Sequence, residues 1–202
     1  MITMLRWKSN EIVKGDIFLQ HSIKRYSQIL VGFALLVTLS FTYDGEAEAA
    51  GTQGIYYGLH PDVVQKAELV RQIAAEQGIL IRYTDGYRSF EQQDALYNQG
   101  RITEGPVVTN ARGGQSYHNY GLAIDFVLTD HYGNAHWELD RDINGNGVSD
   151  WVDVGNIAKS VGFTWGGDWA SFPDYPHLQL DYGMSLADLQ YWYNQGYYQF
   201  AY

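Results

Sequence analysis

One short stretch of the sequence places a histidine and an aspartate in an apolar setting. Residues 116–126 read SYHNYGLAIDF, and Asp125 lies inside the run from Leu122 to Leu128, which is otherwise apolar. Such a run is typical of a buried strand. Because an unpaired carboxylate is costly to bury, another group must compensate Asp125.

A second histidine, His177, begins the segment 177–182 (HLQLDY), whose apolar residues alternate as in a strand. Since side chains alternate between the faces of a strand, Asp125 and His177 can point into one cleft if their strands are neighbours. Gly121 lets the chain bend so that His118 turns back over Asp125. Two histidines and one aspartate suit catalytic zinc, with a fourth position open for water. The alternative is three side chains satisfied by hydrogen bonds in the core.

Two further charged residues fit a metal site of this kind. A zinc hydrolase needs a proton acceptor near the attacking water. Asp174 lies three residues before His177, and prolines on both sides restrict its backbone. An ordinary turn aspartate is the alternative. Arg88 follows a predicted strand, from which its guanidinium can reach a substrate carboxylate or an oxyanion. A surface salt bridge is the alternative for Arg88.

These residues occur in a pattern that resembles a known family. SYHNYGLAIDF fits the S-x-H-x-x-G-x-A-x-D motif of the zinc D-alanyl-D-alanine carboxypeptidases and L-alanyl-D-glutamate endopeptidases, which are peptidoglycan peptidases. The resemblance continues through YTDGYRSFEQQDALYNQGR and IAKSVGFTWGGDWASFPDYPHLQL, and covers roughly residues 55–190. The form DYPH, preceded by WGGDW, resembles the endopeptidase branch. The vancomycin-resistance type of carboxypeptidase usually has Glu and Trp where this chain has Asp174 and Pro176.

The resemblance implies a role for each residue of the site. It implies that His118, Asp125 and His177 are the zinc ligands. Asp174 would be the acid/base that takes a proton from the attacking water and returns it to the leaving amine. Arg88 would hold the substrate or stabilise the oxyanion.

The implied activity is hydrolysis of the L-alanyl-D-glutamate bond of peptidoglycan stem peptides. We also expect Ser116 and Gln179 to contact either the metal ligands or the substrate. D-alanyl-D-alanine carboxypeptidase activity on the same peptides is the alternative. A remote alternative is a cell-wall binding module that holds zinc without catalysis, and the filled acid/base position argues against it.

The elements that must position these residues indicate an α+β fold. The resemblance implies a small central antiparallel sheet that carries the zinc cleft. Helical spacing of apolar residues predicts helices at 60–78, 90–100, 151–163 and 185–196, and strands are predicted at 79–89, 122–128 and 177–182. Ser89 and Gly100 are the expected start and end signals of the second helix. Residues 101–115 and 164–176 are predicted loops.

Composition limits the possible classes of protein. The chain has 202 residues, 46% of them hydrophobic, which is enough for one domain with a core. A formal net charge of −10 argues against a nucleic-acid binder. The absence of cysteine excludes disulfides and thiolate metal ligands. We expect peptidoglycan as the partner and a monomer, with no protein partner implied.

The N-terminal part of the sequence predicts export. Basic residues precede the apolar run 29–41, and an A-x-A pattern ends at Ala49. This order is typical of a signal peptide, which we predict over residues 1–49. Residues 50–202 would then form the zinc peptidase domain, secreted to the cell wall. If the segment is retained, it would instead act as a membrane anchor.

A second metal site is predicted in the segment 142–153, which reads DINGNGVSDWVD. Its spacing is that of an EF-hand-type calcium loop, with Gly147 at the required sixth position. Position 12 is Asp rather than Glu, and no entering helix is predicted. A plain Asn-Gly turn is the alternative. The calcium ligands would be Asp142, Asn144, Asn146, the carbonyl of Val148, Asp150 and Asp153.

Overall fold

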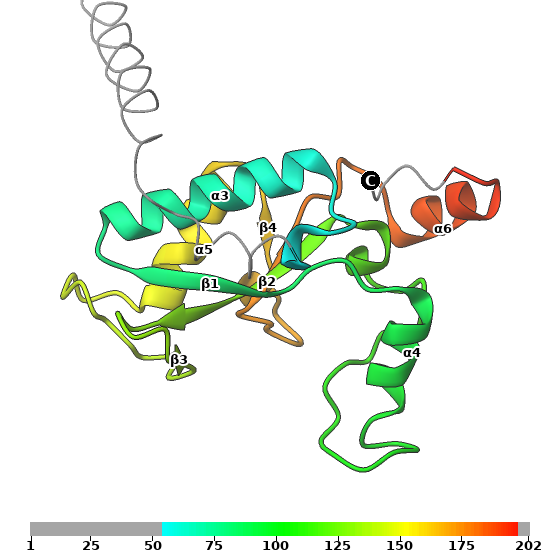
Figure 1. Cartoon of the computed structure of the whole chain (residues 1–202), viewed down its shortest axis with the longest axis horizontal. Coiled ribbons are helices and arrows are strands. Elements are labelled where there is room, and N and C mark those ends of the chain that lie inside the picture. The colour runs from blue at the N-terminus through cyan, green and yellow to red at the C-terminus, as the bar shows by residue number, and fades with distance from the viewer. Residues whose placement is uncertain (1–53, 198–202) are drawn as a thin grey trace, which may run out of the picture. The chain divides into compact units, whose positions relative to one another are not determined.

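The computed structural model describes residues 54–197 of the chain. In these residues one antiparallel sheet is accompanied by helices, so the predicted α+β class is confirmed (Figure 1). The predicted signal segment, residues 1–49, lies outside the described residues. Within 54–197, no helix combines the length and the apolar character needed to cross a membrane.

The sheet has the strand order β1-β2-β5-β4, and β3 pairs with β2 beside this path. Neighbouring strands are antiparallel throughout. The central strand β2 is buried along nearly its whole length, on both faces of the sheet. This explains why its sequence is almost continuously apolar. The strands are β1 (Leu80–Asp85), β2 (Ala123–Thr129), β3 (Ala135–His136), β4 (Thr164–Trp165) and β5 (His177–Gln179).

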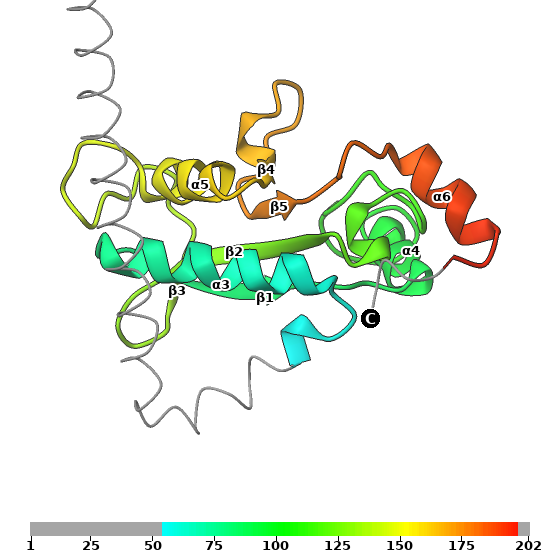
Figure 2. The same ribbon diagram turned by 90° about the horizontal axis from the view of Figure 1, so that it is seen from above.

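Two helices form the main core with the sheet. Helix α3 (Pro61–Glu76) lies along β1 and β2 and packs against α5 (Asp150–Ser160) (Figure 2). In the core, the ring of Phe126 in β2 lies 5.1 Å from that of Trp151 in α5. The buried face of α3 consists of Val63, Ala67, Val70 and Ala74, at the predicted helical spacing.

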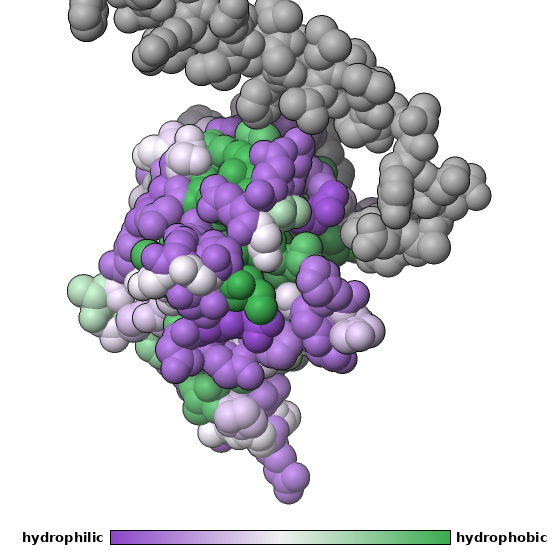
Figure 3. Space-filling model, turned by 90° about the vertical axis from the view of Figure 1, so that its left-hand side faces the viewer, coloured by the Kyte–Doolittle hydropathy of each residue, from purple (hydrophilic) through white to green (hydrophobic). Residues whose placement is uncertain are grey.

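The face of the molecule seen in Figure 3 is mainly hydrophilic, with apolar residues confined to small patches.

Two further helices lie together at one end of the sheet (Figure 2). Helices α4 (Phe90–Asn98) and α6 (Leu186–Asn194) contribute to a second, smaller apolar cluster. In this cluster Phe90 stacks on Tyr193, with ring centroids 4.6 Å apart. Tyr120, Leu122 and Leu189 are its buried members.

A capping box fixes the start of α4. The Ser89 hydroxyl accepts the backbone N–H of Gln92, and the Gln92 side chain accepts the backbone N–H of Ser89. The predicted N-cap is therefore confirmed, and such caps are worth about 1 kcal/mol. Because Arg88 directly precedes this cap, the cap also fixes the direction in which the chain presents Arg88.

Two short elements in the segment 164–176 were not predicted. The strand β4 and the 3-10 helix η3 (Gly166–Asp168) occupy part of what the sequence predicts to be a loop. Strand β4 has two residues, which is too short for an alternating pattern to be read. The strand predicted at 177–182 is regular only over β5.

Helix α5 and β4 are in close contact through a glycine. A Cβ atom at Gly155 would lie 2.4 Å from the ring of Trp165, which is buried and donates its indole N–H to the carbonyl of Tyr175. In a helix, Ala is favoured over Gly by about 1 kcal/mol. Overpacking a rigid core costs about 1–3 kcal/mol. We therefore expect Gly155→Ala to lower the free energy of unfolding, measured by urea denaturation.

The matched control is Asn156→Ala, at the exposed position next to Gly155 in the same helix. This substitution gains helix propensity without meeting the Trp165 ring, so its stability should equal or exceed that of the wild type. A Gly155→Ala protein as stable as the wild type would show that Trp165 can move aside.

Candidate metal centre

The pairing of β2 with β5 places Asp125 directly opposite His177. Residues opposite each other on neighbouring strands project from the same face of a sheet. His118 comes from the 3-10 helix η2 (Tyr117–Tyr120), which ends at Gly121 with a φ of 68°. Glycine adopts this left-handed conformation without steric cost, so the chain turns sharply from η2 into β2.

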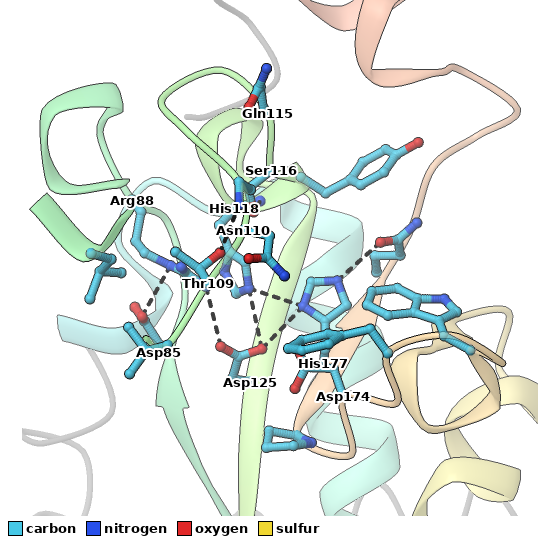
Figure 4. Close-up of a pocket in the computed structure, with 18 of the residues that line it drawn as sticks. Asp85, Arg88, Thr109, Asn110, Gln115, Ser116, His118, Asp125, Asp174 and His177 are labelled. Carbon is cyan, nitrogen blue, oxygen red and sulfur yellow. Dashed lines mark hydrogen bonds and ion pairs between the residues drawn. The ribbon is translucent and has the colours of Figure 1, made fainter. Parts of the chain in front are cut away.

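The donor atoms of the three residues converge. Oδ1 of Asp125 lies 3.2 Å from Nε2 of His118 and 3.2 Å from Nδ1 of His177. The two ring nitrogens are themselves 3.2 Å apart. One ligand atom from each residue falls within 4.8 Å of the others, an arrangement that can hold a metal ion. Figure 4 shows the three side chains pointing toward one another.

The second nitrogen of each imidazole is held by an acceptor. Nδ1 of His118 lies 2.6 Å from the carbonyl oxygen of Gly86, and Nε2 of His177 lies 3.0 Å from Oε1 of Gln179. Because both partners are acceptors, these nitrogens carry the protons. When both imidazoles are neutral, the lone pairs of the other two nitrogens face Asp125. Metal-binding histidines are usually oriented by such a bond on the opposite nitrogen, so the residues fit a metal ion.

The charges of the cluster are strongly coupled. Burial alone would raise the pKa of Asp125, but His118 and His177 outweigh it and hold that pKa well below its ordinary value. Burial alone would lower the pKa of His177, but the hydrogen bond and charge of Asp125 outweigh it and raise that pKa. Without metal, a proton on His177 therefore offsets the charge of Asp125. A bound cation would replace this proton.

Arg88 lies between two carboxylates at the edge of the cluster. A β-bulge between Tyr83 and Asp85 shifts the register so that Asp85 pairs with Asp125. Nε of Arg88 lies 3.1 Å from Oδ2 of Asp85, and NH2 lies 3.3 Å from Oδ2 of Asp125. The guanidinium thus offsets the repulsion between two opposed carboxylates. Its third nitrogen, NH1, donates to Oε1 of Gln93 at 2.9 Å.

Asp174 is half-buried beside the cluster of His118, Asp125 and His177. Its backbone N–H donates to the carbonyl of Gly166 at 3.0 Å, and its carbonyl accepts the N–H of His177 at 3.2 Å. A Cβ atom at residue 166 would lie 2.5 Å from the Asp174 carbonyl oxygen, so glycine is required there. Burial raises the pKa of the Asp174 carboxyl, and the charge of Asp125 raises it further. A carboxyl group with a raised pKa is suited to accept and return a proton.

The cluster opens into a cleft of about 690 Å³, the size of a small-ligand pocket. One wall is the segment 108–111, in which Thr109 and Asn110 lie near the cluster of His118, Asp125 and His177 (Figure 4). Trp169 contributes to the lining, with its ring 5.2 Å from that of His177. Arg88 and Asp174 also line the cleft, so both can reach a bound molecule.

Comparison with known proteins decides the family. The family described as D-alanyl-D-alanine carboxypeptidase matches residues 109–180. The peptidoglycan L-alanyl-D-glutamate endopeptidase CwlK of Bacillus subtilis (strain 168) is 55% identical over 122 residues, which cover 60% of this chain and 73% of that relative. The chain belongs to this family of peptidoglycan peptidases. The predicted family membership, including the endopeptidase branch, is thereby confirmed.

Two further proteins are similar to this peptidase. The L-alanyl-D-glutamate peptidase of Listeria phage A118 is 36% identical over 105 residues, which cover 52% of this chain and 32% of that longer protein. The crystal structure of the L-Ala D-Glu endopeptidase ChiX of Serratia marcescens aligns with a TM-score of 0.45 and 25% identity. That alignment covers 68% of this chain and 89% of ChiX.

Ser116 and Gln179 of the peptidase both touch metal-site residues. The Ser116 hydroxyl caps η2 by accepting the backbone N–H of His118 at 3.4 Å. Gln179 accepts the ring N–H of His177, as described above. Both residues also line the cleft. Of the two roles expected from the sequence, contact with the histidines is the one that the geometry shows directly.

The predicted calcium loop has no support in the structure. The carboxylate of Asp150 is fully buried, accepts the backbone N–H of Ile143 at 3.1 Å and lies 3.8 Å from Nε of Arg141. The residue expected at position nine is therefore already paired. Among residues 54–197, the group placed to hold a metal is the one formed by His118, Asp125 and His177. Hydrogen bonds within the loop join the remaining predicted ligands, which are Asp142, Asn144, Asn146, Val148 and Asp153.

Three contributors to the site were not found from the sequence. Gly86 contributes a backbone carbonyl, for which residue type carries no signal. Asp85 is brought opposite Asp125 by the bulge, which depends on strand pairing. Gln93 is fully buried in α4, three residues after Phe90. Gln93 is thus a polar residue at helical spacing from an apolar one, and this pattern is the feature of the sequence that could have indicated its burial.

The coupling between Asp125 and His177 predicts how pH affects the metal-free protein. A raised pKa of His177 contributes stability below the ordinary histidine pKa, about 6.5. That contribution is lost as the pH rises through the raised value. We therefore expect the Tm of chelator-treated protein to fall as the pH increases above neutrality.

Asp125→Asn removes the charge that raises the pKa of His177. Chelator-treated Asp125→Asn protein should therefore show a weaker decline of Tm over the same pH range. Equal declines in the two proteins would contradict the assigned coupling.

Proposed function

We propose that this chain is a zinc peptidase that hydrolyses the L-alanyl-D-glutamate bond of peptidoglycan stem peptides. The proposal rests chiefly on the converging donors of His118, Asp125 and His177, in a chain 55% identical to a relative named for that activity. The second candidate is D-alanyl-D-alanine carboxypeptidase activity, which the matching family's description favours. The sequence DYPH at residues 174–177 favours the endopeptidase.

The donor set supports zinc as the metal. Two imidazole nitrogens and one carboxylate oxygen are a common ligand set of catalytic zinc, and the chain has no cysteine to form a thiolate site. The ligand atoms would be Nε2 of His118, Nδ1 of His177 and Oδ1 of Asp125, which face one another. Bound zinc would act as a Lewis acid and lower the pKa of a water molecule to about 7.

Asp174 is the proposed proton carrier. Its carboxylate lines the cleft and accepts no hydrogen bond from residues 54–197, so both oxygens are available to water. It would take a proton from the attacking water and deliver it to the amine of the departing D-glutamate. The raised pKa of Asp174 favours the second of these steps.

Arg88 has two proposed contributions. NH1 donates to Gln93 and NH2 donates to Asp125, whereas Nε is buried 3.1 Å from Oδ2 of Asp85 without a hydrogen bond. NH1 and NH2 each carry two N–H groups, so one N–H on each remains for the substrate. They can donate to the carbonyl oxygen that becomes negatively charged during attack, while the others hold Asp125 in place.

We further propose that residues 1–49 direct export and that residues 50–202 form the peptidase domain. The substrate supports this proposal, because peptidoglycan lies outside the cytoplasmic membrane. The protein would then act as a secreted monomer on the cell wall. N-terminal sequencing of protein from the culture medium tests the boundary, since cleavage after Ala49 leaves Ala50 first.

The proposed function is tested by digesting purified peptidoglycan with the zinc-loaded protein. We expect mass spectrometry to detect new peptides that begin with D-glutamate, and none with chelator-treated protein. Release of free D-alanine without these peptides would instead support the carboxypeptidase. Neither product would reject both activities.

Asp174→Asn should reduce turnover by about 10²–10⁴-fold, the usual contribution of a general acid–base group. Zinc content and Tm should stay close to wild type, because Asp174 is not among the converging ligands. The matched control is Asp168→Asn, which removes an exposed carboxylate paired with Lys159 at 2.8 Å. Near-wild-type turnover of Asp174→Asn would require a different proton acceptor.

A further inference from the structure

Helix α4 buries a polar side chain completely. Gln93 has an exposed fraction of 0%. A buried amide is costly unless its polar atoms are bonded. Oε1 of Gln93 accepts a hydrogen bond from NH1 of Arg88 at 2.9 Å, and Nε2 donates to the carbonyl of Ala111 at 2.9 Å. The amide is therefore satisfied at both ends.

The two partners fix the orientation of this amide. An arginine only donates hydrogen bonds, and a backbone carbonyl only accepts them. The oxygen of Gln93 must therefore face Arg88, and its nitrogen must face Ala111. A glutamate would keep the first bond and lose the second, whereas an apolar side chain would lose both.

The amide oxygen of Gln93 is connected, through Arg88, to the proposed metal ligands. Arg88, held at NH1 by Gln93, donates from NH2 to Oδ2 of Asp125 at 3.3 Å. This bond occupies Oδ2 and leaves Oδ1 facing the two histidines. The orientation of Arg88 thus determines which carboxylate oxygen of Asp125 is presented to the metal. Partners of metal ligands commonly tune metal affinity in this way.

The amide nitrogen of Gln93 bonds to the wall of the cleft. Ala111 belongs to the segment 108–111, which lines the cleft beside the ligands. A second buried amide reinforces the connection. Nδ2 of Asn119 donates to the carbonyl of Arg88 at 2.9 Å, and its Oδ1 accepts the N–H of Gly114 at 2.9 Å. Gln93 therefore joins Arg88 to this wall, and Asn119 joins the backbone of Arg88 to Gly114, three residues after Ala111.

We propose that Gln93 is a positioning residue of this peptidase, which holds Arg88 against Asp125 and the cleft wall at Ala111 with one amide. Being fully buried, Gln93 acts through these neighbours and not by touching the substrate. The expected effect on turnover rests on the proposed function. The expected effect on zinc affinity does not depend on it.

The test compares two substitutions in the full chain. Gln93→Met keeps the length of the side chain and removes both polar atoms. We expect zinc titration of the chelator-treated protein to show about tenfold weaker binding, and kcat to fall by about 10–100-fold with a much smaller change in KM. Gln93→Glu keeps an acceptor for Arg88, so its zinc affinity should stay within about threefold of wild type.

The order of the two variants separates positioning from a purely structural role. A glutamate places a buried negative charge against the carbonyl of Ala111, which harms the fold more than methionine does. If Gln93 served only the fold, Gln93→Glu would therefore bind zinc more weakly than Gln93→Met, and that result would overturn the proposal. Should Gln93→Met fail to fold, a tenfold loss of zinc affinity in Gln93→Glu would also overturn it.

A double-mutant cycle tests whether Gln93 acts through Arg88. In an Arg88→Ala background, Gln93→Met should have little further effect on zinc affinity, because the connecting guanidinium is already absent. Additive losses would reject the proposed connection. The matched control is Gln72→Met, which replaces an exposed glutamine of α3 bonded to Glu76 at 3.0 Å. This control should behave as wild type in both measurements.

The outcomes also separate this proposal from the proposed function. If the wild type does not cleave L-alanyl-D-glutamate bonds, that function fails, and zinc affinity alone decides the role of Gln93. If the wild type is active while Gln93→Met keeps wild-type zinc affinity and kcat, the positioning role of Gln93 is rejected and the proposed function stands.

Discussion

The structure depends on the carboxylate of Asp125 in the central strand, whose side chain is only 19% exposed. A charge in this position would oppose folding if it were left unpaired. His118 and His177 approach one of its oxygens, and Arg88 approaches the other. Each partner comes from a different part of the chain, so η2, β5 and the segment between β1 and α4 must all be in place. The interactions that compensate this carboxylate also bring together the three donors of the candidate metal centre.

Backbone geometry around the site follows from the same requirement. Gly121 turns the chain so that His118 lies over Asp125, and Gly166 lets the backbone of Asp174 approach closely. The bulge in β1 brings Asp85 opposite Asp125, where Arg88 neutralises the pair. These features are local departures from regular structure, and they are concentrated where side chains must converge.

The pKa values of two carboxyl groups in the cleft are shifted in opposite directions by their surroundings. His118 and His177 lower the pKa of Asp125 despite its burial, whereas burial and the charge of Asp125 raise the pKa of Asp174. Pairs of this kind often mark a division of roles at an active site. Asp125 is suited to remain charged as a ligand, and Asp174 is suited to exchange a proton with the substrate.

The sequence by itself determined the features that depend on local pattern. These include the α+β class and the cap at Ser89. Strand alternation and Gly121 allow His118, Asp125 and His177 to meet only if the two strands are neighbours, and the pairing of β2 with β5 meets that condition. The tertiary structure decided what depends on register and burial. Spacing predicted Asp150 as a calcium ligand, but the fold buries it against Ile143 and Arg141. The register of β1 on β2 selected Asp85, and the packing of α4 buried Gln93 beside Arg88. Such contacts join residues that are distant in the chain, and their energies depend on which groups are desolvated together.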